Sequence, residues 1–220
     1  LGDAPIGTFN EPWGIAVAPN GDVLVSDTWN HRIQRFTADG TPIKMWGSFG
    51  GADTTEGLYG PRGIAVSQDN KVFVADTGNK RIMISVSYTH KFNEPTDVKV
   101  DIDGNVFVAD AWNQRVQMFS QVDDGTYTPV KFWNVDGWNS QTLDNKPYLA
   151  VSNNRVFLTD PEGYRVIEFR KDGTFVQLWG EFGIENNQFG LPNGIAVDAS
   201  GAVWVADAGN NRIMKFDITQ

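Results

Sequence analysis

The segment Val25-Ser26-Asp27-Thr28-Trp29-Asn30-His31-Arg32-Ile33 decides the fold, because close variants of it recur along the chain. In each copy an Asp closes an apolar stretch and an Arg follows five positions later. The successive Asp residues are 49, 34, 50 and 47 positions apart, with a mean of 45. Self-similarity at a period of roughly 20–50 residues is the signature of a repeat architecture. The five pairs are Asp27 and Arg32, Asp76 and Arg81, Asp110 and Arg115, Asp160 and Arg165, and Asp207 and Arg212.

Each copy reads as a set of short strands. In the first copy, residues 14–17, 23–26, 32–36 and 42–46 are rich in Val, Ile and Phe and are separated by Gly, Asn and Asp. Pro19-Asn20-Gly21 supplies a hairpin turn between the first two. No stretch shows sustained helical periodicity. Four short antiparallel strands in about 45 residues are typical of one blade of a β-propeller.

The repeated segment resembles the hallmark of the NHL repeat family, V-A-D-x-x-N-H-R-I/V. The resemblance covers nearly the whole chain, and the fourth copy departs from it with Gly163 where the family has Asn. It implies an all-β propeller of NHL repeats with five recognisable blades of about four antiparallel strands. We expect one domain over residues 1–220, with repeats at about 12–50, 61–94, 95–139, 146–183 and 192–220. The other close copies are Val74-Ala75-Asp76-Thr77-Gly78-Asn79-Lys80-Arg81-Ile82, Val108-Ala109-Asp110-Ala111-Trp112-Asn113-Gln114-Arg115-Val116 and Val205-Ala206-Asp207-Ala208-Gly209-Asn210-Asn211-Arg212-Ile213.

The number of blades in the complete ring has two interpretations. Leu1-Gly2 resembles the Trp46-Gly47 and Trp179-Gly180 ends of a fourth strand, and the last copy stops after its third strand. Either five blades close a ring around an incomplete last one, or the chain is a segment of a larger, six-bladed propeller, and the segment is favoured. The second copy is also short, so we expect the stretch around Tyr88 and His90 to be irregular.

The five Asp–Arg pairs are interpreted as structural staples. A carboxylate at a strand end can accept the backbone N–H groups of the following turn. The Arg can then bridge that carboxylate to carbonyl oxygens within the blade or in its neighbour. Because the pair occurs at five equivalent places, replacing one should lower stability without abolishing any chemistry.

Asp97 and Lys99 are candidates for the central channel. They interrupt the Gly and Ala pattern that Gly14 and Ala16 set in the first strand of the first copy. Residues two apart on a strand share a face, so a local ion pair is favoured over a channel-lining ligand contact.

The variable positions beside the repeated motif are the candidates for ligand binding. In a propeller, the loops from fourth to first strand and from second to third strand emerge on the same face. Aromatic side chains there offer a large contact area and a polar handle, which suits sugar rings or an extended peptide. The candidates are Trp13, Trp29, His31, Arg62, Thr96, Trp112, Tyr148 and Asn193.

Composition limits the chemistry. The chain has no Cys and two His, so thiolate sites are excluded and a three-His metal site cannot be built. Asp101-Ile102-Asp103-Gly104-Asn105 resembles the start of a calcium loop, but it lacks the distal Glu and stands at a hairpin position, so we expect a turn. We therefore expect neither a metal nor another cofactor.

Three functions remain open at this stage. We favour a non-catalytic binding scaffold that presents an aromatic-rich loop face to a protein or glycan partner. The first alternative is a metal-dependent lyase or hydrolase that uses the mouth of the central channel, with Asp97 and backbone oxygens as metal ligands. The second is an RNA-binding NHL domain, which the net charge of −9 disfavours because nucleic-acid affinity depends on Lys and Arg contacts.

Two features of the sequence bear on cellular context. No apolar run approaches the roughly 18 residues that cross a bilayer. An extracytoplasmic location in a bacterial protein is favoured, as part of a larger multidomain chain or assembly, although the absence of Cys fits a cytosolic protein equally well.

Overall fold

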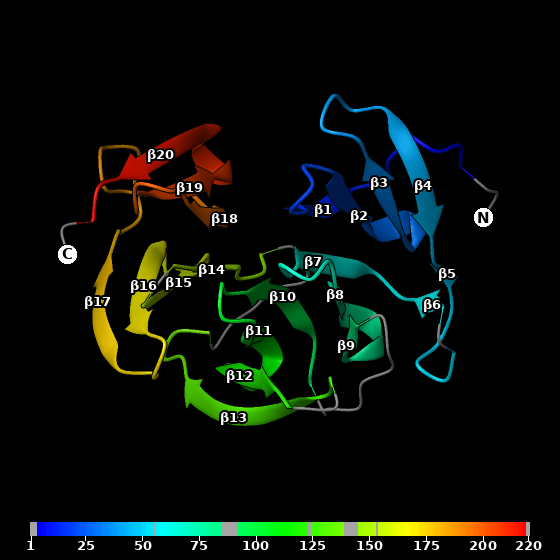
Figure 1. Ribbon diagram of the computed structural model, residues 1–220. Coiled ribbons are helices and arrows are strands. Elements are labelled where there is room, and N and C mark those ends of the chain that lie inside the picture. The colour runs from blue at the N-terminus through cyan, green and yellow to red at the C-terminus, as the bar shows by residue number, and fades with distance from the viewer. Residues whose placement is uncertain are drawn as a thin grey trace. The chain divides into compact units, whose positions relative to one another are not determined.

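The computed structural model describes residues 4–54, 56–84, 92–122, 125–138, 145–152 and 154–218. This part of the chain contains twenty strands and four short 3₁₀ turns, and it contains no α-helix (Figure 1). The strands form a five-bladed β-propeller arrangement of antiparallel sheets. The all-β propeller class predicted from the repeats is therefore confirmed.

The first blade is a four-stranded antiparallel sheet. Its strands are β1 (Pro12–Val17), β2 (Val23–Asp27), β3 (Arg32–Phe36) and β4 (Pro42–Trp46), in that order across the sheet. β3 and β4 have the predicted bounds, whereas β1 begins two residues earlier and β2 extends to Asp27, which pairs with Pro12.

The chain divides into two compact units, residues 1–104 and 105–220, and each is described by itself. The predicted single-domain boundaries stay a prediction. After the first blade, the first unit contains β5 (Ser48–Phe49), β6 (Gly57–Leu58), β7 (Pro61–Val66), β8 (Val72–Asp76), β9 (Arg81–Ile84) and β10 (Pro95–Val100). The second contains β11 (Val106–Asp110), β12 (Arg115–Gln121), β13 (Tyr127–Asn134), β14 (Leu149–Val151), β15 (Arg155–Asp160), β16 (Arg165–Arg170), β17 (Phe175–Trp179), β18 (Pro192–Val197), β19 (Val203–Asp207) and β20 (Arg212–Phe216).

Most sheets follow the chain order of their strands. In the first unit, β7, β8 and β9 form an antiparallel sheet against which β10 packs, and β5 pairs with β6 in parallel. In the second unit, consecutive antiparallel pairs join β11 to β13, β14 to β17 and β18 to β20. The stretch around Tyr88 and His90, which the sequence predicts to be irregular, lies outside the described residues.

The repeated motif forms the turn between the second and third strands. In four copies a 3₁₀ turn follows the Asp, and the next residue adopts the left-handed conformation, with φ 53° at His31 in the first copy. The chain thus reverses within four residues, which aligns Asp27 with Arg32 across β2 and β3. The four turns are η1 (Thr28–Asn30), η2 (Thr77–Asn79), η3 (Ala111–Asn113) and η4 (Ala208–Asn210).

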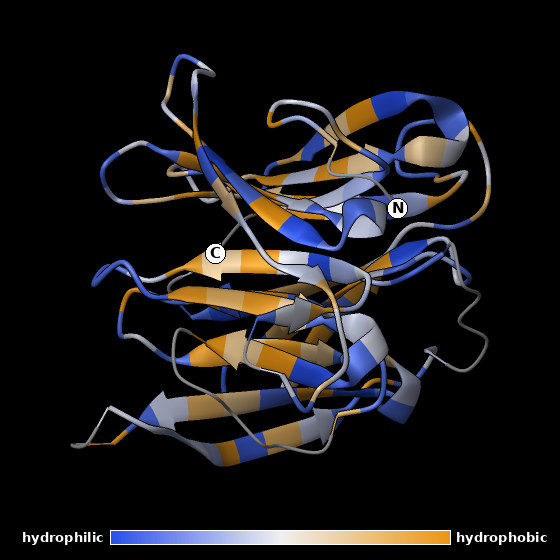
Figure 2. Ribbon diagram, turned by 90° about the vertical axis from the view of Figure 1, so that its right-hand side faces the viewer, coloured by the Kyte–Doolittle hydropathy of each residue, from blue (hydrophilic) through white to orange (hydrophobic). Residues whose placement is uncertain are grey.

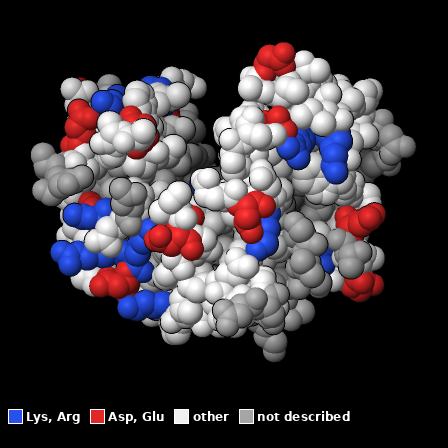
Figure 3. Space-filling view, in the orientation of Figure 1, with Lys and Arg blue, Asp and Glu red and all other residues white. Residues whose placement is uncertain are grey.

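Polar and apolar residues alternate along many of the strands, as the bands of colour in Figure 2 show. Such alternation places one set of side chains on each face of a sheet. Charges on the surface are mixed: on the face shown in Figure 3, Lys and Arg side chains lie beside Asp or Glu in both units.

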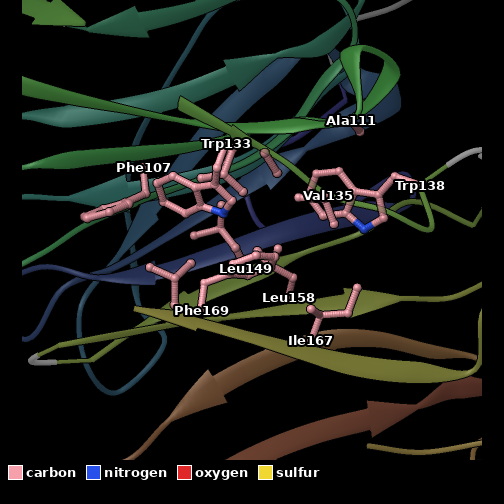
Figure 4. Packing of buried hydrophobic residues seen from close by; sticks show 12 residues of the cluster. Phe107, Ala111, Trp133, Val135, Trp138, Leu149, Leu158, Ile167 and Phe169 are labelled. Carbon is pink, nitrogen blue, oxygen red and sulfur yellow. The ribbon is translucent and has the colours of Figure 1, made fainter. Parts of the chain in front are cut away.

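The cores lie between neighbouring sheets of each unit. In the first unit, Leu24 and Ile33 of the first blade pack with Leu58, Ile64 and Val74. In the second unit, Phe107, Trp133 and Trp138 point toward Leu149, Leu158, Ile167 and Phe169 of the following blade (Figure 4). Each blade is therefore held by apolar packing against its neighbour within the unit.

Residues 101–104 form the predicted turn. The Gly104 N–H donates to the Asp101 carbonyl at 3.1 Å, and the Asp103 N–H donates to a carboxylate oxygen of Asp101 at 3.0 Å. The carboxylate of Asp101 thus serves its own turn.

Candidate functional site

In the first, second, fourth and fifth copies, the Asp–Arg pair fastens the turn to the segment that leads into the same blade. In every copy the Arg Nε donates to an Asp oxygen at 2.7–2.9 Å, and each of the five carboxylates is fully buried. In the first copy, the Asn10 N–H also donates to Asp27, and Arg32 donates to the carbonyl oxygens of Pro5 and Thr8. This geometry is what the interpretation as staples requires, and the effect on stability stays a prediction.

The fourth copy lacks the Asn side chain that the other copies place beside the Asp carboxylate. In the other four copies the Asn of the motif donates a hydrogen bond to the Asp carboxylate, as Asn210 does to Asp207 at 2.8 Å. Burial raises the pKa of Asp160, beside which Gly163 offers only a backbone N–H. Burial acts on Asp207 too, but hydrogen bonds from the Leu191 N–H, the Asn210 amide and other donors outweigh it and lower the pKa.

Three of the predicted binding residues make contacts within the protein or are buried in it. The Arg62 guanidinium is buried and lies over the Trp13 ring, with its carbon 4.0 Å from the ring centroid. Thr96 is fully buried in β10. Trp13 and Arg62 therefore pack on each other, and ligand contacts by these three residues stay predictions.

The predicted binding residues of the second unit differ in their exposure to solvent. Tyr148 and Asn193 are half-buried, and Trp112 is exposed. The ammonium group of Lys146 lies 5.2 Å from the centroid of the Trp112 ring. Lys146 itself is buried, so the protein supplies its own cation to this Trp.

Asp97 and Lys99 form a close ion pair. The Lys99 ammonium lies 2.6 Å and 2.7 Å from the two carboxylate oxygens of Asp97, which is buried. Gly63 lies directly opposite, where a Cβ would collide with Asp97. The ion pair that the sequence analysis favours is therefore present.

His31 is the centre of an aromatic cluster in the first unit. Its ring lies 6.3 Å from Trp29, 5.0 Å from Phe49 and 5.9 Å from Tyr59, measured between ring centroids. Phe49 and Tyr59 also contact each other edge to face at 5.4 Å. We call Trp29, His31, Phe49 and Tyr59 the His31 cluster.

The His31 cluster has a buried base, which is His31, and an exposed rim, which consists of Trp29, Phe49 and Tyr59. His31 is 7% exposed, whereas Trp29, Phe49 and Tyr59 are 42%, 66% and 44% exposed. His31 Nδ1 accepts a hydrogen bond from the Gly60 N–H at 3.1 Å, which fixes the ring. Burial lowers the pKa of His31, although the Asp76 carboxylate acts in the opposite sense, so the imidazole is neutral at neutral pH.

A cavity of about 250 Å³ opens beside the cluster. Trp29, His31 and Phe49 form part of its wall, together with Arg32, Met45 and Trp46. The Trp29 Nε1–H donates to a carboxylate oxygen of Glu11 at 3.0 Å, which orients the indole. Concave sites lined mainly by aromatic side chains with a few polar groups are typical of ligand pockets.

Trp29 and His31 are among the binding residues predicted from the sequence, whereas Phe49 and Tyr59 are not. One signal existed: Trp46-Gly47-Ser48-Phe49-Gly50 has a counterpart in Trp179-Gly180-Glu181-Phe182-Gly183. Phe182 lies 4.9 Å from Tyr164, the residue that matches His31 in the fourth copy. The Phe at this place therefore packs on the turn residue in two copies.

Among the described residues, no three His, Asp or Glu side chains are grouped so that they could hold a metal ion. No helix long and apolar enough to cross a bilayer occurs in the same part of the chain.

Comparison with known proteins identifies the repeat. The family model of the NHL repeat matches residues 9–36, 58–84, 92–119 and 189–216. The NHL repeat-containing protein 3 of Homo sapiens is 35% identical over 83 residues, which are 36% of this chain and 24% of that protein. The match therefore spans about a quarter of the length of this relative.

Solved structures share the architecture. A streptogramin B lyase superposes with a TM-score of 0.63 at 20% identity, over 93% of this chain and 64% of that one. A chain of a nidogen/laminin complex superposes with a TM-score of 0.60 at 16% identity, over 94% of this chain and 75% of that one. At such identities the likeness extends to the fold alone.

Proposed function

The chain belongs to the NHL repeat family, and from this premise we propose that it is a non-catalytic binding scaffold whose aromatic loop face takes a protein or glycan partner. The repeats build a framework of buried Asp–Arg pairs and apolar packing, whereas the loops beside the turns differ from copy to copy. Repeat folds commonly individualise one surface in this way.

The His31 cluster is the observation that carries the proposal. Three exposed aromatic side chains, from η1, from β5 and from the residue after β6, lie within one small area of the first unit. Exposed apolar groups that are gathered, rather than scattered singly, mark interaction sites. Aromatic rings with a polar edge, such as Trp and Tyr, contribute strongly to such contacts.

The support beneath the rim favours binding as well. His31 adopts a left-handed backbone conformation, and its ring is held by the Gly60 N–H. The rim side chains thus rest on a fixed base, and preorganisation lowers the entropic cost of association.

Arrays of glycans and of peptides, probed with the purified protein and with a Trp29→Ala plus Tyr59→Ala variant, test this function. We expect ligands of one class to bind the wild type and to lose at least about tenfold in affinity with the variant. Phe182→Ala is the matched control, because Phe182 occupies the same repeat position as Phe49 and is 69% exposed. Binding that survives the double substitution would contradict the assignment to this face.

The alternative function is that of a metal-dependent lyase or hydrolase with its site at the mouth of the central channel. The similarity in fold to a streptogramin B lyase favours this alternative. In this chain the channel candidate Asp97 is engaged by Lys99. Elemental analysis of the purified protein separates the two functions: a stoichiometric divalent ion that Asp97→Asn removes would support the enzyme.

A further inference from the structure

The protein places its own cations over exposed Trp rings. Lys146 lies over Trp112, and the Lys215 ammonium lies 5.9 Å from the centroid of Trp204. Arg62 does the same at the half-buried Trp13. A cation over an indole face is attracted by the negative quadrupole of the ring.

Trp29 differs from its counterpart in the third copy. Trp29 and Trp112 both stand two residues after the Asp of the motif, and Lys146 and Gly60 both precede the Pro that leads into the next blade. At residue 60 there is no side chain to lay over Trp29. Within the described part of the chain, no Lys or Arg lies over the Trp29 ring.

The surroundings of Trp29 favour a positive ligand. The Glu11 carboxylate accepts the indole N–H, and such a hydrogen bond increases the electron density of the ring. The one cationic side chain in the cavity wall, Arg32, is paired with Asp27 at 2.8 Å. His31 is neutral at neutral pH, so it adds no repulsion.

The shape of the site favours a compact cation over a flat sugar. The rings of Trp29 and His31 are inclined at 88°, and those of His31 and Phe49 at 54°, so the aromatic side chains in the cavity wall do not form one flat platform. The cavity of about 250 Å³ is smaller than the roughly 300–1,000 Å³ that drug-sized ligands occupy.

The polar groups of the cavity decide which cation fits. Its wall contains no Asp or Glu, and the guanidinium of Arg32 is engaged by Asp27 and by carbonyl oxygens. A primary ammonium group would find no carboxylate in this wall to accept its N–H donors, and only neutral oxygens such as those of Asn30 and Ser48. A quaternary ammonium group has no N–H donors and suits aromatic walls.

We infer that the cavity beside Trp29, His31 and Phe49 binds a quaternary ammonium group, such as the headgroup of choline or a trimethylated lysine side chain. This inference rests on the proposed function and names the ligand chemistry of the same face. The Trp29 and Phe49 rings contact the methyl groups, and the indole takes the role toward the ligand that Trp112 has toward Lys146.

Calorimetric titration with choline, and with its neutral tert-butyl isostere in which carbon replaces nitrogen, tests the inference. Choline should bind roughly tenfold or more tightly than the isostere, because the two differ in charge and match in shape. Equal affinity would overturn the inference while leaving an apolar binding face intact. If neither binds but the arrays reveal a partner that needs Trp29 and Tyr59, the inference is wrong and the proposed function stands.

Variants locate the site. Trp29→Ala and Phe49→Ala should abolish choline binding, and Phe182→Ala should leave it unchanged.

Gly60→Lys should compete with the ligand by placing an internal ammonium group near Trp29, whereas Gly60→Gln should not. A Cβ at Gly60 meets no atom within 4 Å, and Glu11 and Glu94 precede their prolines at similar φ, so both residues fit. Choline binding that is equal in the Lys and Gln variants would contradict the placement on Trp29.

Two peptides of one sequence, with lysine or trimethyl-lysine at the same place, distinguish the source of the group. Tighter binding of the methylated peptide than of choline would assign the cavity to a modified protein. Equal binding of choline and the methylated peptide, with none of the unmethylated one, would assign it to the ammonium group itself. Preference for the unmethylated peptide would overturn the inference.

Discussion

At the scale of single residues, the Asp–Arg pairs differ in how well they are shielded from water. The side chain of Arg32 is 6% exposed and that of Arg165 is 28% exposed, although both donate to a fully buried carboxylate at 2.8 Å. Arg32 also donates to the carbonyl oxygens of Pro5 and Thr8 and contacts the sulfur of Met45. A buried charge that loses its partner is strongly destabilised.

We therefore expect Arg32→Gln to lower the free energy of unfolding by about 3–5 kcal/mol, because it leaves the Asp27 carboxylate buried without its cation. Arg165→Gln should cost less, because solvent reaches that pair and screens it. Urea denaturation of the two variants beside the wild type measures both values. A larger loss for Arg165→Gln would contradict this ranking.

His31 should make stability depend on pH. Burial lowers its pKa in the folded protein, so the unfolded chain takes up the proton first as pH falls. The stability that the neutral imidazole maintains is fully present above the unfolded-state pKa of about 6.5. It is lost as pH falls from there toward the lower pKa that His31 has in the folded protein. One such group changes the unfolding free energy by at most about 1.4 kcal/mol per pH unit.

Denaturation of the wild type and of His31→Asn at pH 7.5 and at lower pH tests this. Asn suits the left-handed backbone, as Asn211 shows at the same place in the fifth copy. The variant should lose less stability on acidification, since its other titrating groups are the same. Parallel pH profiles would show that His31 does not titrate as argued.

The residues of the motif were predictable, whereas the rim of the site was only half predictable. Asp27, Arg32 and their counterparts stand out because the same spacing from Asp to Arg recurs five times. Trp29 and His31 belong to that turn. Phe49 and Tyr59 come from the variable segment between blades, and only tertiary packing brings them to His31.

At the scale of elements, the first strands of the blades approach one another closely in the first unit. A Cβ on Gly63 of β7 would collide with Asp97 and with the backbone of β10. Gly194 of β18 has the same place in the fifth copy, where a Cβ would meet only the Ala206 methyl at an ordinary 3.6 Å. One repeat position thus has two different steric environments.

Gly63→Ala should lower the free energy of unfolding by about 1–3 kcal/mol, the usual cost of overpacking. Gly194→Ala is the matched control and should change it little. Thermal unfolding followed by circular dichroism compares the two. Equal losses would show that close packing at Gly63 is not the cause.

Strand positions were predictable from the repeats to within two residues at each end in the first blade, because alternation and hairpin turns are local signals. The short parallel pair of β5 and β6 was not, because a two-residue strand has no period to read. That pair carries Phe49 into the site.

At the scale of the whole molecule, charge is the property that bears on partners. The chain has 27 acidic and 18 basic residues. On the face shown in Figure 3 the basic side chains are interspersed with acidic ones. Binding to a phosphate backbone depends on gathered Lys and Arg, and it weakens as salt rises.

We expect the protein to retain no RNA, even in dilute salt. Gel-shift measurements with structured and single-stranded RNA at two salt concentrations test this expectation, and the conditions can be validated with a basic RNA-binding protein. Retention that falls steeply with added salt would revive the RNA-binding alternative.

The left-handed residue that ends each turn has a consequence for protein engineering. His31, Lys80, Gln114, Tyr164 and Asn211 share φ values of 52–57°, and none of them is β-branched. Bulky β-branched side chains are strained in this conformation. A combinatorial library that diversifies these five positions should therefore omit Val, Ile and Thr, and its selected binders should vary in charge, length and aromaticity but not in branching.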